Sequence, residues 1–210
     1  MQIGTVINLN GYKKSKIFLK QNKLTVLVFS VFIISFITFL FLSRENTVLN
    51  NYGKFFVKRL LEERSNVKFF KVAVNSFFSY LLIIAINFSF GTSMFGIVFI
   101  PLIVAYLGAH YGIISTFLYA NYSLTGIAFH AVIILPSAVV FIAALFYSAR
   151  ACFDFSFSIA RITFSRNVNV TVYESFKKYC IKHIYIIFLV LASALIDALI
   201  STNLITKFNF

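Results

Sequence analysis

The sequence predicts an all-α, polytopic integral membrane protein, in which residues 1–210 form a single bundle of five or six transmembrane helices. Hydrophobic residues make up 60% of the chain and charged residues 12%, against about 45–50% and 25% in soluble domains. Residues 72–149 contain no Asp, Glu, Lys or Arg. Because a spanning helix needs about 20 apolar residues, this block alone has room for three or four crossings.

The charge distribution points to a membrane surface and away from nucleic acid. Lys and Arg outnumber Asp and Glu by 19 to 6, and they gather in three blocks beside hydrophobic segments. This pattern suits anionic lipid headgroups, and no stretch is long and polar enough to form a nucleic-acid-binding domain. Cys152 and Cys180 form no CxxC or Cys/His spacing, so we expect neither a disulfide nor a metal site.

The first span is predicted at residues 24–43, directly after a basic segment without acidic residues. Its apolar run is longer than that of a signal peptide, and no small-x-small cleavage site follows it, so we expect a retained helix. In the mixed-charge connection 44–71, Tyr52, Phe56 and Leu60 recur at helical spacing. This favours an amphipathic helix at the membrane interface. A solvated loop helix and a partner-binding helix are the alternatives.

Breaks in the apolar block divide it into three spans. Small and polar residues at 91–93 and 120–123 leave spans at 72–90, 94–119 and 126–149. A second amphipathic connection, expected to be helical, covers residues 150–183, and the last span covers 184–201.

The orientation of the bundle has two alternatives. Charge counting slightly favours six spans with an external N-terminus. The length of the third segment favours five spans with an internal one.

Three features of the spans are candidates for a structural or functional role. Gly108 and Gly112 lie four residues apart on one helix face and predict close helix packing, with a kink or a binding site as the alternative. Pro136 predicts a bend, and His130 either hydrogen-bonds across the bundle or titrates. Asp197 is the one acid inside a predicted span.

Asp197 is costly in lipid. An ionised Asp costs about 2.5–3.5 kcal/mol at a helix centre on the insertion scale, and less near an end. It therefore indicates a site or a paired interior residue, unless its side chain reaches the interface.

These landmarks together resemble the stage II sporulation protein M family of bacterial membrane proteins. In that family an Asn opens the second span and Gly ends it, a GxxxG lies in the third, a motif ending in Pro and a small residue marks the next, and an acid lies near the end of the last. The matching positions here are Asn75, Gly91, Gly108, Gly112, Pro136, Ser137 and Asp197. Many wider relatives place an acid where Ile134 stands here. The absence of this acid here favours the sporulation branch of the family over a transporter-like relative.

The resemblance implies a non-enzymatic scaffold of endospore formation in the plasma membrane. It would hold cell-wall hydrolases at the septal membrane while the mother cell engulfs the forespore. The implied partners are stage II sporulation proteins D and P or similar peptidoglycan hydrolases, with anionic and other membrane lipids. Self-association is open. Gly108, Gly112, Pro136 and Asn75 would pack or bend helices, while Asp197 and His130 would be buried polar or partner contacts.

The same residues are compatible with two other functional hypotheses. A transporter or channel subunit would line a polar path with Asp197 and His130. An intramembrane serine protease of the rhomboid type would use Ser93 with His130 as its base, but Met94 stands where that family has a second glycine. Since no paired-carboxylate, P-loop or dinucleotide pattern appears, we expect no catalytic site and no cofactor.

Overall fold

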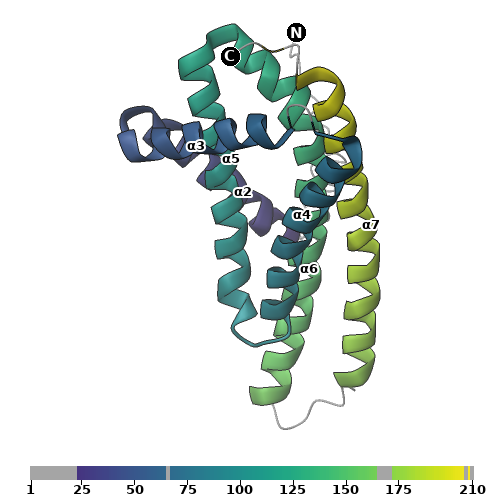
Figure 1. Cartoon of the computed structure of the whole chain (residues 1–210). Coiled ribbons are helices and arrows are strands. Elements are labelled where there is room, and N and C mark those ends of the chain that lie inside the picture. The colour runs from purple at the N-terminus through teal and green to yellow at the C-terminus, as the bar shows by residue number, and fades with distance from the viewer. Residues whose placement is uncertain (1–22, 65–66, 165–171, 206–207, 209–210) are drawn as a thin grey trace, which may run out of the picture.

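The structure is a computed structural model that describes residues 23–64, 67–164, 172–205 and 208. Within these ranges the chain is helical and contains no strand (Figure 1), which confirms the predicted all-α fold class. The elements in chain order are α2 (Lys23–Glu45), α3 (Thr47–Arg64), α4 (Phe69–Gly91), α5 (Gly96–Phe129), the π-helix η1 (His130–Ile134), α6 (Leu135–Phe164) and α7 (Val172–Leu204).

Four helical segments of the described chain are long and apolar enough to cross a membrane. They are Lys23–Glu45, Phe69–Gly91, Gly96–Phe164 and Tyr173–Leu204. The third reverses direction near Ser123, so that α5 and α6 form the two legs of a hairpin (Figure 1). Ser123 has a φ of 47°, a value that non-glycine residues seldom adopt. The reversal lies within the break expected at residues 120–123, and residues 96–122 run as one helical leg.

The helices α6 and α7 extend beyond the spans expected at 126–149 and 184–201. α6 continues to Phe164 and α7 begins at Val172, so most of the expected connection 150–183 is an extension of these two helices. The charged residues in this segment suggested a boundary. However, Phe153, Phe155 and Tyr179 are each at most 6% exposed, and burial of these rings stabilises the extensions against each other.

Pro136 follows the π-helix η1 at the start of α6. Proline has no N–H to donate to the carbonyl four residues earlier, and its ring crowds that carbonyl. In η1 the wider turn lets the Leu135 N–H donate to the His130 carbonyl instead. The proline therefore lies beside a local irregularity of the helix, at the position where the sequence predicts a bend.

The helix α2 packs along α5 through small residues. A Cβ at Gly108 would lie 2.6 Å from the Phe32 carbonyl oxygen, and one at Gly112 would lie 2.6 Å from that of Phe36. The two backbones therefore approach more closely than any larger residue would allow. Across the same contact, the Thr116 hydroxyl donates to the Leu40 carbonyl at 2.8 Å.

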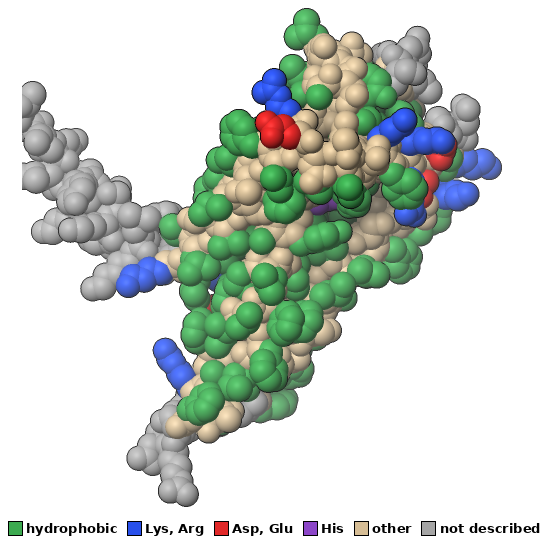
Figure 2. Space-filling view, turned by 90° about the vertical axis from the view of Figure 1, so that its left-hand side faces the viewer, with side chains coloured by type: hydrophobic (Ala, Val, Ile, Leu, Met, Phe, Trp, Pro, Cys, Tyr) green, Lys and Arg blue, Asp and Glu red, His purple; other side chains and the backbone are tan. Residues whose placement is uncertain are grey.

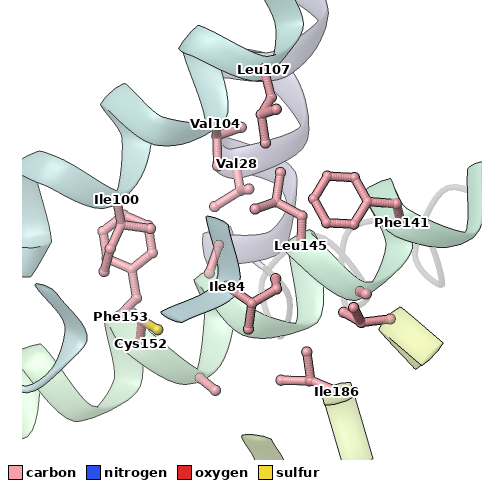
Figure 3. Packing of buried hydrophobic residues seen from close by; sticks show 14 of the residues in the cluster. Val28, Ile84, Ile100, Val104, Leu107, Phe141, Leu145, Cys152, Phe153 and Ile186 are labelled. Atoms are coloured by element: carbon pink, nitrogen blue, oxygen red, sulfur yellow. The ribbon is translucent and has the colours of Figure 1, made fainter. Parts of the chain in front are cut away.

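The main hydrophobic core lies where α2, α4, α5, α6 and α7 meet. Figure 3 shows how side chains from these helices interdigitate there; its labelled residues include Val28, Ile84, Val104, Leu145 and Ile186. The helices α4, α5, α6 and α7 stand upright in Figure 1, whereas α3 runs across them. Its buried residues Val57 and Leu60 belong to a second cluster with α5 and η1. The expected amphipathic helix in 44–71 is therefore packed against the bundle by its apolar face.

Candidate functional site

A buried ion pair joins α3 to α7. Arg64, the last residue of α3, donates two hydrogen bonds to Asp197, from Nη1 to Oδ1 at 2.9 Å and from Nη2 to Oδ2 at 2.7 Å. The side chain of Asp197 is 1% exposed and that of Arg64 is 16% exposed. This bidentate geometry matches the planar guanidinium to the two carboxylate oxygens. Asp197 is thus a paired interior residue, one of the two alternatives that the sequence left open.

Three serines complete the polar surroundings of this pair. The Ser76 hydroxyl donates to Asp197 Oδ2 at 2.5 Å, and the Ser137 hydroxyl donates to Oδ1 at 3.3 Å. Arg64 Nη1 also donates to Ser201 Oγ at 2.9 Å. We call these five residues the ion-pair cluster. Because its members come from α3, α4, α6 and α7, the cluster fixes the end of α3 against three upright helices.

The ion-pair cluster borders a cavity of about 460 Å³ between α3 and the upright helices. This volume lies within the range of about 300–1,000 Å³ that is usual for small-ligand sites. Residues of α3, α4, α5, η1, α6 and α7 line it: Tyr52, Phe55, Phe56, Arg59, Leu60, Glu63, Arg64, Val72, Asn75, Ser76, Ser79, Tyr80, Ile83, Tyr106, Leu107, His110, Tyr111, Ile114, Ile134, Ser137, Phe141 and Asp197. Asp197, the one acid inside the spans predicted from the sequence, therefore borders a cavity and does not lie in a packed core.

Tyr52 and His110 form the side of the cavity nearest the middle of α3. The Tyr52 hydroxyl lies 3.0 Å from His110 Nδ1, and the ring of Phe56 packs edge-on against the imidazole with centroids 4.7 Å apart. Burial, reinforced by Tyr106, raises the pKa of Tyr52 to about 12. The phenol therefore keeps its proton at neutral pH, and it can donate that proton to His110.

The comparisons with known proteins identify the family of the chain. The model of the family described as "SpoIIM: Stage II sporulation protein M" matches residues 25–202, most of the sequence. The chain belongs to this family. No curated protein and no solved structure matches it. The match confirms the resemblance that the sequence suggested, and it includes all the candidate residues of the spans, from Asn75 to Asp197.

The structure places the family's other landmark positions apart from the cavity or at its wall. Asn75 lines the cavity, whereas Gly108 and Gly112 face α2. Ile134 is 7% exposed and also lines the cavity. The cavity wall therefore carries an apolar side chain at this position.

His130 lies outside the cavity and has partners at both ring nitrogens. Ser115 Oγ lies 3.2 Å from Nε2, and Tyr119 OH lies 3.1 Å from Nδ1. The side chain is 8% exposed. The structure therefore separates the two residues of the transport hypothesis, because Asp197 borders the cavity while His130 joins the two legs of the α5–α6 hairpin.

Ser93 and His130, the pair of the protease hypothesis, lie far apart. Ser93 precedes α5, and its hydroxyl donates to the Phe90 carbonyl at 3.2 Å. His130 contacts Ser115, and the helical rise from Gly96 to Ser115 is roughly 28 Å. A nucleophile and its base must lie within hydrogen-bonding reach of each other, so this pair cannot act together in the structure.

A second polar cluster, which sequence reasoning missed, lies between α4, α6 and α7. We call it the thiol cluster; it comprises Asn87, Ser148, Cys152, Tyr179 and His183. His183 Nε2 lies 3.2 Å from Ser148 Oγ and 3.6 Å from Cys152 Sγ, and Asn87 Nδ2 donates to Ser148 Oγ at 3.0 Å. The Tyr179 hydroxyl donates to the Phe88 carbonyl at 2.7 Å. No spacing in the sequence predicts these contacts, because the residues come from three different helices.

The described residues contain no group of three or more His, Cys, Asp or Glu side chains that could hold a metal ion. In the ion-pair cluster the carboxylate is occupied by a guanidinium and two hydroxyls. Such an arrangement holds helices together and presents polar groups to the cavity. It does not supply a free acid or base for proton transfer.

Proposed function

We propose that this protein is a non-enzymatic membrane scaffold of the sporulation machinery, which holds peptidoglycan hydrolases at the septal membrane during engulfment. The partners would be stage II sporulation proteins D and P or similar hydrolases. Membership of the stage II sporulation protein M family supports a sporulation role in a membrane. One observation supports the scaffold function most directly. Asp197, the acid inside the predicted spans, is paired with Arg64 and thereby holds α3 against the bundle.

The contacts of the buried polar residues favour a role in assembly. Arg64 and Asp197 satisfy each other, and His130 is held between Ser115 and Tyr119. A bundle whose polar groups bind one another is rigid at those points. Such a bundle suits a platform that fixes the position of its partners, while the catalytic work of cutting the cell wall belongs to those partners.

The exposed face of α3 is our proposed partner surface. The side chains of Lys54 and Lys58 are exposed there, and α3 is fixed to the bundle by Arg64 and Leu60 on its other side. A helix held in this way presents its outer residues at a defined place, which lowers the entropy cost of binding a partner.

Deletion of the gene in a spore former tests the scaffold. We expect fluorescently tagged wall hydrolases to lose their septal localisation and engulfment to stop, and the wild-type gene to restore both. If engulfment is normal and the hydrolases remain at the septum, the scaffold function is wrong.

Charge-reversal variants test the proposed surface. We expect Lys54→Glu with Lys58→Glu to fail in restoring hydrolase localisation, because both change the exposed face of α3. The matched control is Lys177→Glu with Lys178→Glu, which changes two exposed lysines on α7 and should restore it. Immunoblots must show equal amounts of both proteins. Equal rescue by the two pairs would rule out α3 as the partner surface.

A further inference from the structure

We propose that the cavity between α3 and the upright helices binds the phosphate-bearing headgroup of a membrane lipid. This ligand class goes beyond the scaffold function and does not depend on it. The cavity combines three properties that such a headgroup requires: a position at the membrane surface, polar hydrogen-bond donors, and a positively charged neighbourhood.

The position of the cavity follows from the length of α4. This helix has 23 residues and so rises roughly 35 Å, close to the 30 Å thickness of the hydrocarbon core. Because α3 ends a few residues before α4 begins, α3 lies near one membrane surface. The cavity therefore begins beside α3 at the depth of lipid headgroups, and its lining continues along α4 from Val72 to Ile83, toward the middle of the span.

The rim of the cavity is apolar and aromatic where it faces outward. Phe55 on α3 is 65% exposed, and Tyr106 on α5 is 62% exposed; both line the cavity. Aromatic side chains of this kind favour the boundary between headgroups and acyl chains. A lipid can therefore place its headgroup inside while its acyl chains stay beside the apolar rim.

The lining offers donors that the protein does not use. The Asn75 side chain is exposed in α4 and makes no hydrogen bond to any described residue, although it stands in a segment that crosses the membrane. Arg64 binds Asp197 and Ser201 through Nη1 and Nη2, which leaves its Nε–H available. Amide and guanidinium N–H groups are the donors that phosphate oxygens accept from most strongly.

The charge around the cavity favours an anion. The chain from Thr47 to Lys71 carries the basic residues Lys54, Lys58, Arg59, Arg64, Lys68 and Lys71 but only two acids, Glu62 and Glu63. Figure 2 shows basic and acidic side chains near the top of the molecule, above a largely hydrophobic face, with further basic side chains at its lower left. Basic residues next to a membrane surface attract anionic lipids. Arg59 and Arg64 line the cavity itself, where each is paired with a lining acid, Glu63 and Asp197 respectively. The excess positive charge therefore lies around the cavity, on the lysines of this segment.

Native mass spectrometry of the full chain in detergent tests the site, with phosphatidylglycerol as the probe. Diacylglycerol with the same acyl chains is the phosphate-free arm, and inorganic phosphate is the lipid-free arm. We expect a saturable complex with phosphatidylglycerol that neither inorganic phosphate nor diacylglycerol displaces. Displacement by phosphate would assign the site to the free anion, and displacement by diacylglycerol would show that the headgroup is not recognised; either overturns the proposal.

Two neighbouring residues of α3 distinguish the cavity from a general basic surface. Arg59 lines the cavity and Lys58 does not, yet each forms an i,i+4 pair with a glutamate. We expect Arg59→Gln to weaken phosphatidylglycerol binding about tenfold, the effect of losing one charge-assisted hydrogen bond. Lys58→Gln, which removes the same charge, should leave it within about twofold. Equal losses for both variants would contradict a specific site.

A pair of serines on α4 tests the cavity by steric blocking. Ser79 and Ser89 are both exposed and both donate to the carbonyl four residues earlier, but only Ser79 lines the cavity. We expect Ser79→Trp to abolish the complex and Ser89→Trp to preserve it. If Ser79→Trp binds the lipid as the unchanged chain does, the cavity is not the site.

Discussion

The ion-pair cluster and the thiol cluster are two buried polar groups on one helix that differ in charge and in enclosure. Asp197 and His183 both belong to α7, and the helical rise between them is roughly 21 Å. The ion-pair cluster contains full charges and borders the cavity. The thiol cluster contains no Asp, Glu, Lys or Arg, and no member of it lines the cavity.

The difference shows how this bundle accommodates polar groups of unequal cost. The neutral groups of the thiol cluster bind groups on neighbouring helices, with Cys152 and Asn87 each 0% exposed. A neutral amide tolerates incomplete pairing, since Asn87 Oδ1 is buried without a hydrogen-bond partner among the described residues. A buried carboxylate needs a cation, and Arg64 is supplied by α3, outside the upright helices. The ion-pair cluster therefore fixes the position of α3 on the surface of the bundle, and the cavity lies where α3 meets the upright helices.

The largest effect should follow from breaking the ion pair. We expect Asp197→Ala to destabilise the protein by about 3–5 kcal/mol, the usual cost of leaving one member of a buried pair without its partner. The remaining guanidinium of Arg64 is only 16% exposed. Thermal unfolding of the detergent-solubilised protein, followed by the helical circular dichroism signal, measures the loss.

A double variant separates charge burial from packing. Arg64→Met together with Asp197→Leu removes both charges and keeps similar volumes, so it should recover most of the stability lost in Asp197→Ala. If the double variant is as unstable as the single one, the buried charge of Arg64 is not the cause.

A smaller effect should follow from removing the imidazole of the thiol cluster. We expect His183→Ala to cost about 1–3 kcal/mol, because Ser148 and Cys152 lose a hydrogen-bond partner in a closed site. Tyr185→Ala is the matched control, since this ring on the same helix is 68% exposed. Equal melting temperatures for the two variants would show that the thiol cluster contributes nothing as a network.

Single hydroxyl deletions compare the two clusters directly. Ser76 donates to a carboxylate, whereas Ser148 contacts only neutral groups and a histidine. Hydrogen bonds to charged groups contribute more, so Ser76→Ala should destabilise the protein by about 1 kcal/mol more than Ser148→Ala. The difference in apparent melting temperature tests this, and a larger loss in Ser148→Ala would reverse the ranking of the two clusters.

The sequence predicted the features that depend on local chemistry. Apolar length predicted the helical spans, and the small and polar residues around Ser93 and Ser123 marked both breaks of the central block. The spacing of Tyr52, Phe56 and Leu60 predicted the helix in 44–71. Each of these signals is contained in a few neighbouring residues, so no knowledge of tertiary contacts was needed.

The sequence could not predict the partners that tertiary packing brings together. Arg64 and Asp197 are separated by 133 positions, and Arg64 resembles the other basic residues of its connection. The only signal was the cost of an acid in an apolar span, which requires a cation but does not say which one. The cavity, and the contact of Cys152 with His183, are likewise properties of several helices at once.

Thiol labelling compares the solvent access of the two clusters. Its variants should change stability least and should differ most in labelling rate. In a Cys180→Ala background, Cys152 is the native thiol and is 0% exposed, while a cysteine in place of Ser79 would stand on the exposed rim of the cavity. We expect a water-soluble maleimide to label Ser79→Cys at least about tenfold faster than Cys152, because a buried thiol reacts only when the structure opens locally. Equal rates would mean that the cavity is as closed as the thiol cluster. Since headgroup binding requires an open cavity, that result would contradict the enclosure difference and the lipid site together.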